Sequence, residues 1–146
     1  MHLHPHFDLL LHSDEELSAL LGAALVERET LHEWPLSCVQ RIRLEDGQRW
    51  IYKAAARPTV EPEFYAAARS PVLPCTRKLH RDAHYACLLI EEVHGDRLDS
   101  LSLSEADVLH TAARLLRKIA AIERVPGEDL ALRKKEILGR VDGEVL

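Results

Sequence analysis

The side chains best placed for chemistry are a lysine and two carboxylates that follow it closely in the chain. Lys53 lies near the end of a predicted β-strand, and Glu61 and Glu63 lie where a short helix is predicted to begin. A strand end holds a cation rigidly, as the binding of phosphate groups requires. Two simpler interpretations stay open: a lysine that faces solvent, and carboxylates that stabilise the N-terminus of a helix.

A second group of candidate ligands is the set of histidines in the first twelve residues, which are His2, His4, His6 and His12. Alternating histidines in an extended segment can bind a metal ion. No carboxylate or cysteine pattern beside them in the sequence completes such a site. The alternative interpretation is a flexible, histidine-containing tail over residues 1–12.

The three cysteines, Cys38, Cys75 and Cys87, are widely and irregularly spaced. This pattern fits neither a disulfide framework nor a zinc knuckle. We therefore expect free, mostly buried thiols in a reducing, cytoplasmic setting.

Composition narrows the class of protein further. The chain has 146 residues, 47% of them hydrophobic and 29% charged, which predicts one domain or one lobe of a larger protein. A net charge of −5 argues against nucleic acid as a partner. No apolar run approaches the ~18 residues of a membrane helix, and the N-terminus lacks the pattern of a signal peptide. P-loop, dinucleotide-binding, zinc-protease and serine-hydrolase motifs are absent from the sequence.

The elements that must position Lys53 are predicted from local patterns. Ser13 and Glu16 form a capping box that starts a helix over residues 14–26. Residues 38–44 alternate between two faces and are followed by an Asp46–Gly47 turn signal, so residues 30–55 are predicted to form a three-stranded antiparallel meander.

The second half of the chain alternates between helix and strand signals. A short helix over residues 63–69 follows Pro62, which a helix start tolerates. Strands are predicted over residues 77–80 and, as a buried central strand, 86–90. A long helix is predicted over residues 104–124, and a further helix is expected within residues 130–139.

This order of elements, with residues to match, resembles the N-terminal lobe of the aminoglycoside phosphotransferase and choline kinase-like family, relatives of protein kinases. The resemblance implies an α+β fold: a kinase-like lobe with a small antiparallel sheet, a short helix packed on it, and flanking helices. It also implies three parts, which are the tail (1–12), a nucleotide-binding lobe (13–95), and a linker with a helical segment (96–146).

The resemblance assigns roles to seven residues and implies ATP and Mg²⁺ as cofactors. Lys53 would bind the phosphates, held in place by a glutamate of the short helix, for which Glu63 matches the family better than Glu61. Ile51 would form a roof over adenine, and Ile90 would form the back of the adenine pocket. Ser37 would contact a phosphate, and backbone groups of Glu91 and Val93 would bind the adenine edge.

The chain also departs from the family pattern. The turn expected to contact phosphate contains no glycine, so that Ser37 is its one suitable residue. His94-Gly95-Asp96 resembles the opening of the catalytic loop, but Leu101 stands where a metal-binding Asn should follow. We therefore expect an ATP-binding lobe without its catalytic loop or C-terminal lobe, and not a competent kinase alone. The alternative is a truncated lobe that acts as an interaction or regulatory module through its exposed apolar face, as a homo-oligomer or with a C-lobe partner.

Overall fold

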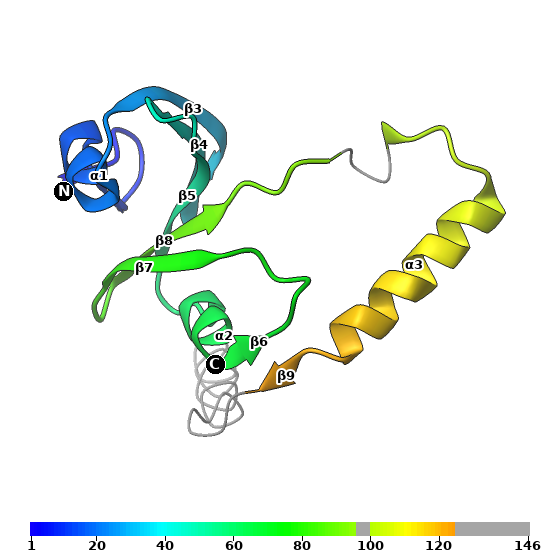
Figure 1. Cartoon of the computed structure of the whole chain (residues 1–146). Helices are drawn as coiled ribbons and strands as arrows, with labels where there is room; N and C mark the ends of the chain where they lie inside the picture. The colour runs from blue at the N-terminus through cyan, green and yellow to red at the C-terminus, as the bar shows by residue number, and fades with distance from the viewer. Residues whose placement is uncertain (96–99, 125–146) are drawn as a thin grey trace, which may run out of the picture.

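A five-stranded antiparallel sheet forms the centre of the molecule in the computed structural model, which describes residues 1–95 and 100–124 (Figure 1). The strand order is β3-β4-β5-β8-β7. The five strands are β3 (Leu25–Trp34), β4 (Ser37–Leu44), β5 (Arg49–Ala56), β7 (Thr76–Arg81) and β8 (Tyr85–Glu91). Helices α1 (Asp14–Leu21), α2 (Glu61–Ala67) and α3 (Glu105–Ala120) complete an α+β fold, as predicted.

Two small strand pairs flank the sheet. Near the N-terminus, β1 (His2–Leu3) pairs with β2 (Leu10–Leu11), and β6 (Ala68–Arg69) pairs with β9 (Glu123–Arg124). The second pair joins the end of α2 to the segment that follows α3.

Helix α1 begins as predicted and ends earlier. Ser13 and Glu16 form both hydrogen bonds of the capping box. The helix stops at Gly22, which adopts a left-handed conformation with φ 78° that glycine tolerates best. The predicted continuation to residue 26 is therefore wrong, because Leu25 already begins β3.

The predicted meander is confirmed and starts earlier than residue 30. Strands β3, β4 and β5 pair consecutively, and Gly47, with φ 86°, makes the tight turn between β4 and β5. The apolar run predicted as a central strand is β8, which pairs with β5 on one side and β7 on the other. Its Cys87 and Leu89 are fully buried.

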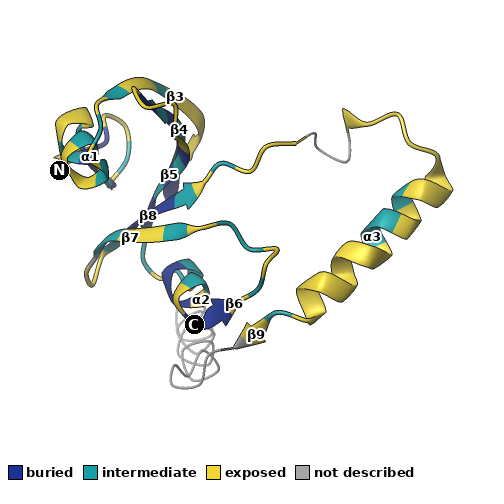
Figure 2. Ribbon diagram, in the orientation of Figure 1, coloured by how far each residue is buried: buried dark blue, intermediate teal, exposed yellow. Residues whose placement is uncertain are grey.

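The hydrophobic core lies on one face of the sheet, under α1 and the N-terminal segment (Figure 2). Tyr52 and Ile42 on the strands pack there with Leu17 of α1. Leu9 and Leu11 belong to the same core. The prediction of a flexible tail over residues 1–12 is therefore corrected: the apolar run in this segment closes the core instead of extending into solvent.

The remaining helices lie on the other side of the sheet or away from it. Helix α2 spans residues 61–67 and not 63–69, because Pro62 lies inside the first turn and not before it. Helix α3 begins after the Ser104 cap as predicted but ends at Ala120, and none of its side chains is buried. The predicted helix within residues 130–139 and part of the predicted linker lie outside the described residues.

Candidate functional site

The sheet face opposite the core carries three of the seven residues predicted to bind nucleotide, which are Lys53, Ile51 and Ile90. Cross-strand partners share a face, and the register places Val39, Lys53 and Leu88 in one row and Arg41, Ile51 and Ile90 in the next. We call these six residues the open face. All except Leu88 remain partly accessible to solvent, in contrast to the alternate residues of the same strands.

Lys53 forms an ion pair with the short helix, as predicted, but with a different glutamate. Lys53 Nζ lies 2.6 Å from Glu61 Oε2, and the two side chains are 27% and 28% exposed. Glu63, the predicted partner, is almost fully buried and lies with Oε1 3.6 Å from Arg57 Nη1. Residues two positions apart point to opposite sides of a helix. Because α2 begins at Glu61, this residue and not Glu63 faces the strand lysine.

Ser37 and Lys53 border one shallow cavity of about 210 Å³ at the end of the β3–β4 hairpin. Arg57 lines the same cavity, so that two cations and a serine share it. The Ser37 hydroxyl accepts a hydrogen bond from the indole Nε1 of Trp34, within the turn. The structure thus brings the predicted phosphate-binding residues together and adds Arg57, which the sequence prediction missed.

The region beside Ile51 is charged, whereas the resemblance implied an apolar roof over adenine. Arg41, the cross-strand neighbour of Ile51, bonds through Nε to Glu92 Oε1 and through Nη1 to Glu29 Oε2, each at 2.7 Å. The two carboxylates raise the pKa of Arg41. An adjoining cavity of about 320 Å³ is lined entirely by charged side chains, which are Glu27, Glu29, Arg41, Arg43, Arg49 and Glu92.

The predicted adenine-binding segment lies where β8 ends. Ile90 is directly opposite Ile51, as a back wall of the site requires. Glu91 makes two hydrogen bonds to Cys75, the residue before β7: its N–H donates to Cys75 O at 2.8 Å, and its Oε2 accepts from Cys75 N at 3.2 Å. Val93 lies beyond the strand and is 73% exposed. The backbone roles of Glu91 and Val93 remain predictions.

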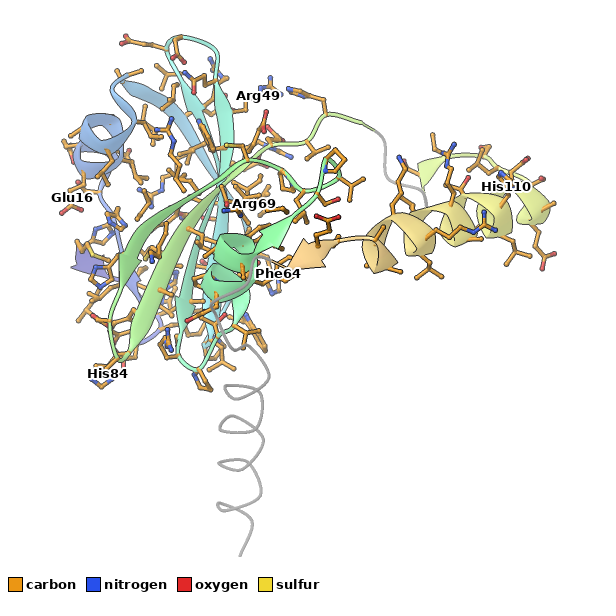
Figure 3. All side chains as sticks on the ribbon, turned by 60° about the horizontal axis from the view of Figure 1, so that its bottom comes forward. Glu16, Arg49, Phe64, Arg69, His84 and His110 are labelled. Atoms are coloured by element: carbon orange, nitrogen blue, oxygen red, sulfur yellow. The ribbon has the colours of Figure 1, made fainter. Side chains whose placement is uncertain are left out.

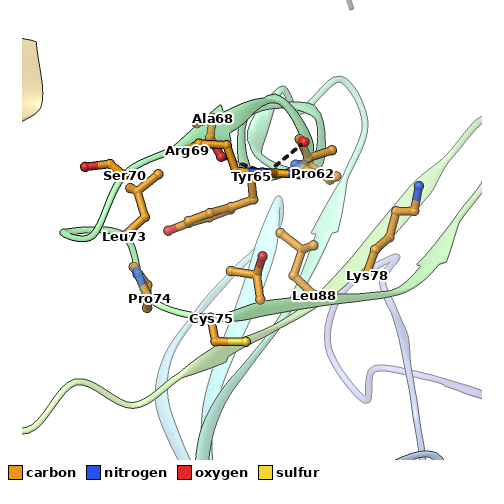
Figure 4. A pocket seen from close by; sticks show the side chains of 12 residues that line it. Pro62, Tyr65, Ala68, Arg69, Ser70, Leu73, Pro74, Cys75, Lys78 and Leu88 are labelled. Carbon is orange, nitrogen blue, oxygen red and sulfur yellow. Dashed lines mark hydrogen bonds between the residues drawn. The ribbon is translucent and has the colours of Figure 1, made fainter. Parts of the chain in front are cut away.

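A further cavity of about 410 Å³ lies between α2 and the β7–β8 strands (Figure 4). Tyr65 and Pro62 of α2 face Leu88 and Lys78 across it. Burial raises the pKa of Tyr65. Leu88 is also the cross-strand partner of Lys53 and a member of the open face, so this cavity adjoins the open face.

The buried face carries polar groups that are shielded from solvent and contact one another. Tyr52 Oη accepts a hydrogen bond from the His12 backbone N–H at 3.0 Å and lies 3.6 Å from Cys87 Sγ. Burial raises the pKa of Cys87 to about 11 and lowers the pKa of His12. A thiol with such a pKa is a poor nucleophile at neutral pH. We therefore regard this cluster as structural.

Among the described residues, no helix combines the length and the apolar character needed to cross a membrane. A scan against protein-family models found no match, and neither did searches of curated proteins and of solved structures.

Proposed function

We propose that the chain is the nucleotide-binding lobe of a kinase-like small-molecule phosphotransferase, similar to the aminoglycoside phosphotransferase and choline kinase-like family. The observation that carries the proposal is the 2.6 Å ion pair between Lys53 and Glu61. A carboxylate on an adjacent helix fixes the ammonium of a strand lysine, and in kinase-like proteins such a lysine holds the α- and β-phosphates of ATP.

The surroundings of the pair support an anionic ligand. Arg57 and Ser37 line the cavity that Lys53 borders, and the hairpin turn between β3 and β4 lies beside it. In this proposal, Lys53 and Arg57 bind the phosphates of Mg-ATP, and Ile51 and Ile90 contact the base. Arg41 must then stack on the base or turn aside, because it lies directly across from Ile51.

The proposal assigns binding, and no catalytic step, to these residues. Phosphoryl transfer depends on a catalytic Asp and on metal-binding residues that position Mg²⁺ and the acceptor. The position of the expected Asn is occupied by Leu101.

The three described cysteines are free, which supports a cytoplasmic location for such a lobe.

Mg-ATP titration of the whole chain tests the proposal, with thermal unfolding and calorimetry as readouts. A ligand at a hundredfold excess over Kd stabilises the folded state by about 2.7 kcal/mol. We expect Lys53→Ala and Glu61→Gln to abolish the shift in Tm. Lys118→Ala, on the exposed helix α3, is the matched control and should preserve it. Equal shifts in all variants, or no heat of binding in the unaltered chain, would refute nucleotide binding at this pair.

One observation favours the second candidate, an interaction module. Helix α3 stands away from the sheet (Figures 1 and 3), and none of its side chains is buried. Leu109 and Leu116 are each 65% exposed, and Ile119 follows on the same side of the helix. An apolar stripe of this kind favours self-association or a C-lobe-like partner. A stable dimer by light scattering, unaffected by Mg-ATP and dissociated by Leu116→Glu, would support this candidate over the first.

A further inference from the structure

Three potential metal ligands meet beside the turn at the tip of the β3–β4 hairpin. A ring nitrogen of His4, a carboxylate oxygen of Glu33 and the thiol of Cys38 all lie within 4.8 Å of one another. His4 and Cys38 are buried, whereas the Glu33 side chain is 43% exposed. The cluster is separate from Lys53 and its cavity, since none of its members lines that cavity.

The fold positions each of the three residues independently. Glu33 and Cys38 are direct cross-strand partners, so their side chains leave the same face of the hairpin. His4 comes from the loop between β1 and β2, where its N–H donates to Leu9 O at 2.8 Å and its ring stacks on Phe7. His4 Nε2 lies 3.2 Å from Glu33 Oε2.

We propose that His4, Glu33 and Cys38 form a binding site for Zn²⁺ or a similar borderline-soft divalent cation. A thiolate, an imidazole and a carboxylate are the three ligand types that zinc takes in proteins. At typical bond lengths of about 2.0–2.3 Å, tetrahedral ligand atoms lie roughly 3.2–3.8 Å apart, so the cluster needs only a small contraction. The exposed side at Glu33 leaves the fourth position to water.

Binding must remove the proton of the Cys38 thiol and change the tautomer of the His4 ring. Burial and the nearby Glu33 raise the pKa of Cys38, and Arg28 opposes them, so that the metal-free site holds a thiol. A bound divalent cation deprotonates a coordinating thiol. The His6 N–H donates to His4 Nδ1 at 3.2 Å, so in the neutral ring Nε2 carries the hydrogen toward Glu33. Coordination through Nε2 moves this hydrogen to Nδ1, at the expense of the contact with His6.

A metal here would join the N-terminal segment to the hairpin tip. Without it, the half-exposed contact between His4 and Glu33 adds to the packing of Leu9 and Leu11 against the core. With it, three bonds to one ion fix residues 4, 33 and 38 together. We therefore expect binding to raise the Tm, because the ion binds the folded chain and not separated ligands.

Titration of the full chain with Co²⁺, and with Zn²⁺ against a chromophoric chelator, tests the proposal. We expect one ion per chain and a thiolate-to-cobalt charge-transfer band. Cys38→Ala should remove the band and weaken Zn²⁺ binding by more than about 100-fold, since loss of a ligand exceeds the 10–100-fold cost of losing a ligand's hydrogen-bond partner. Glu33→Gln, at a half-exposed position, should weaken binding by at least about 10-fold without unfolding the chain.

Two control variants separate this site from metal binding by another thiol or by the other histidines of the N-terminal segment. Cys87→Ser removes the other buried thiol and should leave the cobalt band intact. His6→Gln removes a neighbouring histidine outside the cluster and should leave the stoichiometry at one. Absence of a cobalt band in the unaltered chain would overturn the proposal. It would also be overturned if binding survived in Cys38→Ala but was lost in His6→Gln, which would indicate binding by the histidine-rich segment.

Discussion

On one face of the sheet the side chains of Ile42, Tyr52 and Leu89 are fully buried, whereas on the other the adjacent residues Arg41 and Ile51 remain partly open. Both faces use the same strands and the same register. The buried face is covered by α1 and the N-terminal segment, and the open face is covered only in part by α2. We infer that the difference separates stability from binding: one face supports the fold, and the other carries the proposed nucleotide site.

The largest expected effect is on the covered face. Leu17→Ala removes a fully buried side chain from the core and should lower the free energy of unfolding by about 2–5 kcal/mol. Leu20→Ala, on the exposed side of the same helix, should change it by no more than about 0.5 kcal/mol. Urea denaturation measures both. Equal losses in the two variants would mean that α1 does not cover the core in this way.

The next effect tests the polar group within that core. Tyr52→Phe removes the oxygen that accepts from the His12 N–H and should lower the free energy of unfolding by about 1–3 kcal/mol, because a buried donor loses its partner. Tyr85→Phe, whose hydroxyl donates to Asp8 at an exposed position, is the control and should cost less. A neutral result for Tyr52→Phe would show that His12 N–H finds another acceptor.

A smaller, pH-dependent effect follows from His12. Burial lowers the pKa of folded His12 below 6.5, against the opposing charge of Glu16. The unfolded chain then binds the proton first, so stability falls as the pH drops through 6.5 toward the folded pKa. Chemical denaturation from pH 7.5 to pH 5 should show a steeper loss for the unaltered chain than for His12→Gln. Parallel curves would contradict a buried, neutral imidazole.

The smallest effect on stability is expected on the open face. Lys53→Ala breaks a partly exposed ion pair, which contributes about 0–1 kcal/mol to the free energy of unfolding. The same substitution should nevertheless abolish nucleotide binding. If urea denaturation gave a loss as large as that of Leu17→Ala, Lys53 would be a structural residue, and the contrast between the two faces would fail.

Local signals in the sequence predicted most of the elements. The Ser13 capping box, the Asp46–Gly47 turn and the apolar run of β8 each depend on neighbours in the chain, and each element formed where it was expected. The predicted ends of elements were wrong where a single residue determines where a helix stops. Gly22 stops α1 because it adopts a positive φ angle, a choice that an apolar spacing pattern does not reveal.

Contacts between distant residues were harder to predict. The pairing of Arg41 with Glu92 joins β4 to the residue that follows β8, 51 positions along the chain, so no local pattern indicates a charged cavity beside Ile51. The choice between Glu61 and Glu63 depended on the first residue of α2. For the N-terminal segment a signal was present: the apolar run that includes Leu9 and Leu11 is more typical of a core segment than of a solvated tail.

The most direct test of the central claim is chemical labelling of the lysines by an acyl-phosphate derivative of ATP, which acylates an amine beside the bound phosphates. Peptide mapping by mass spectrometry should find Lys53 labelled, with excess Mg-ATP preventing the reaction and Glu61→Gln weakening it. Labelling of the exposed Lys78 and Lys118 to the same extent as Lys53, with no protection by Mg-ATP, would contradict a nucleotide site on the open face.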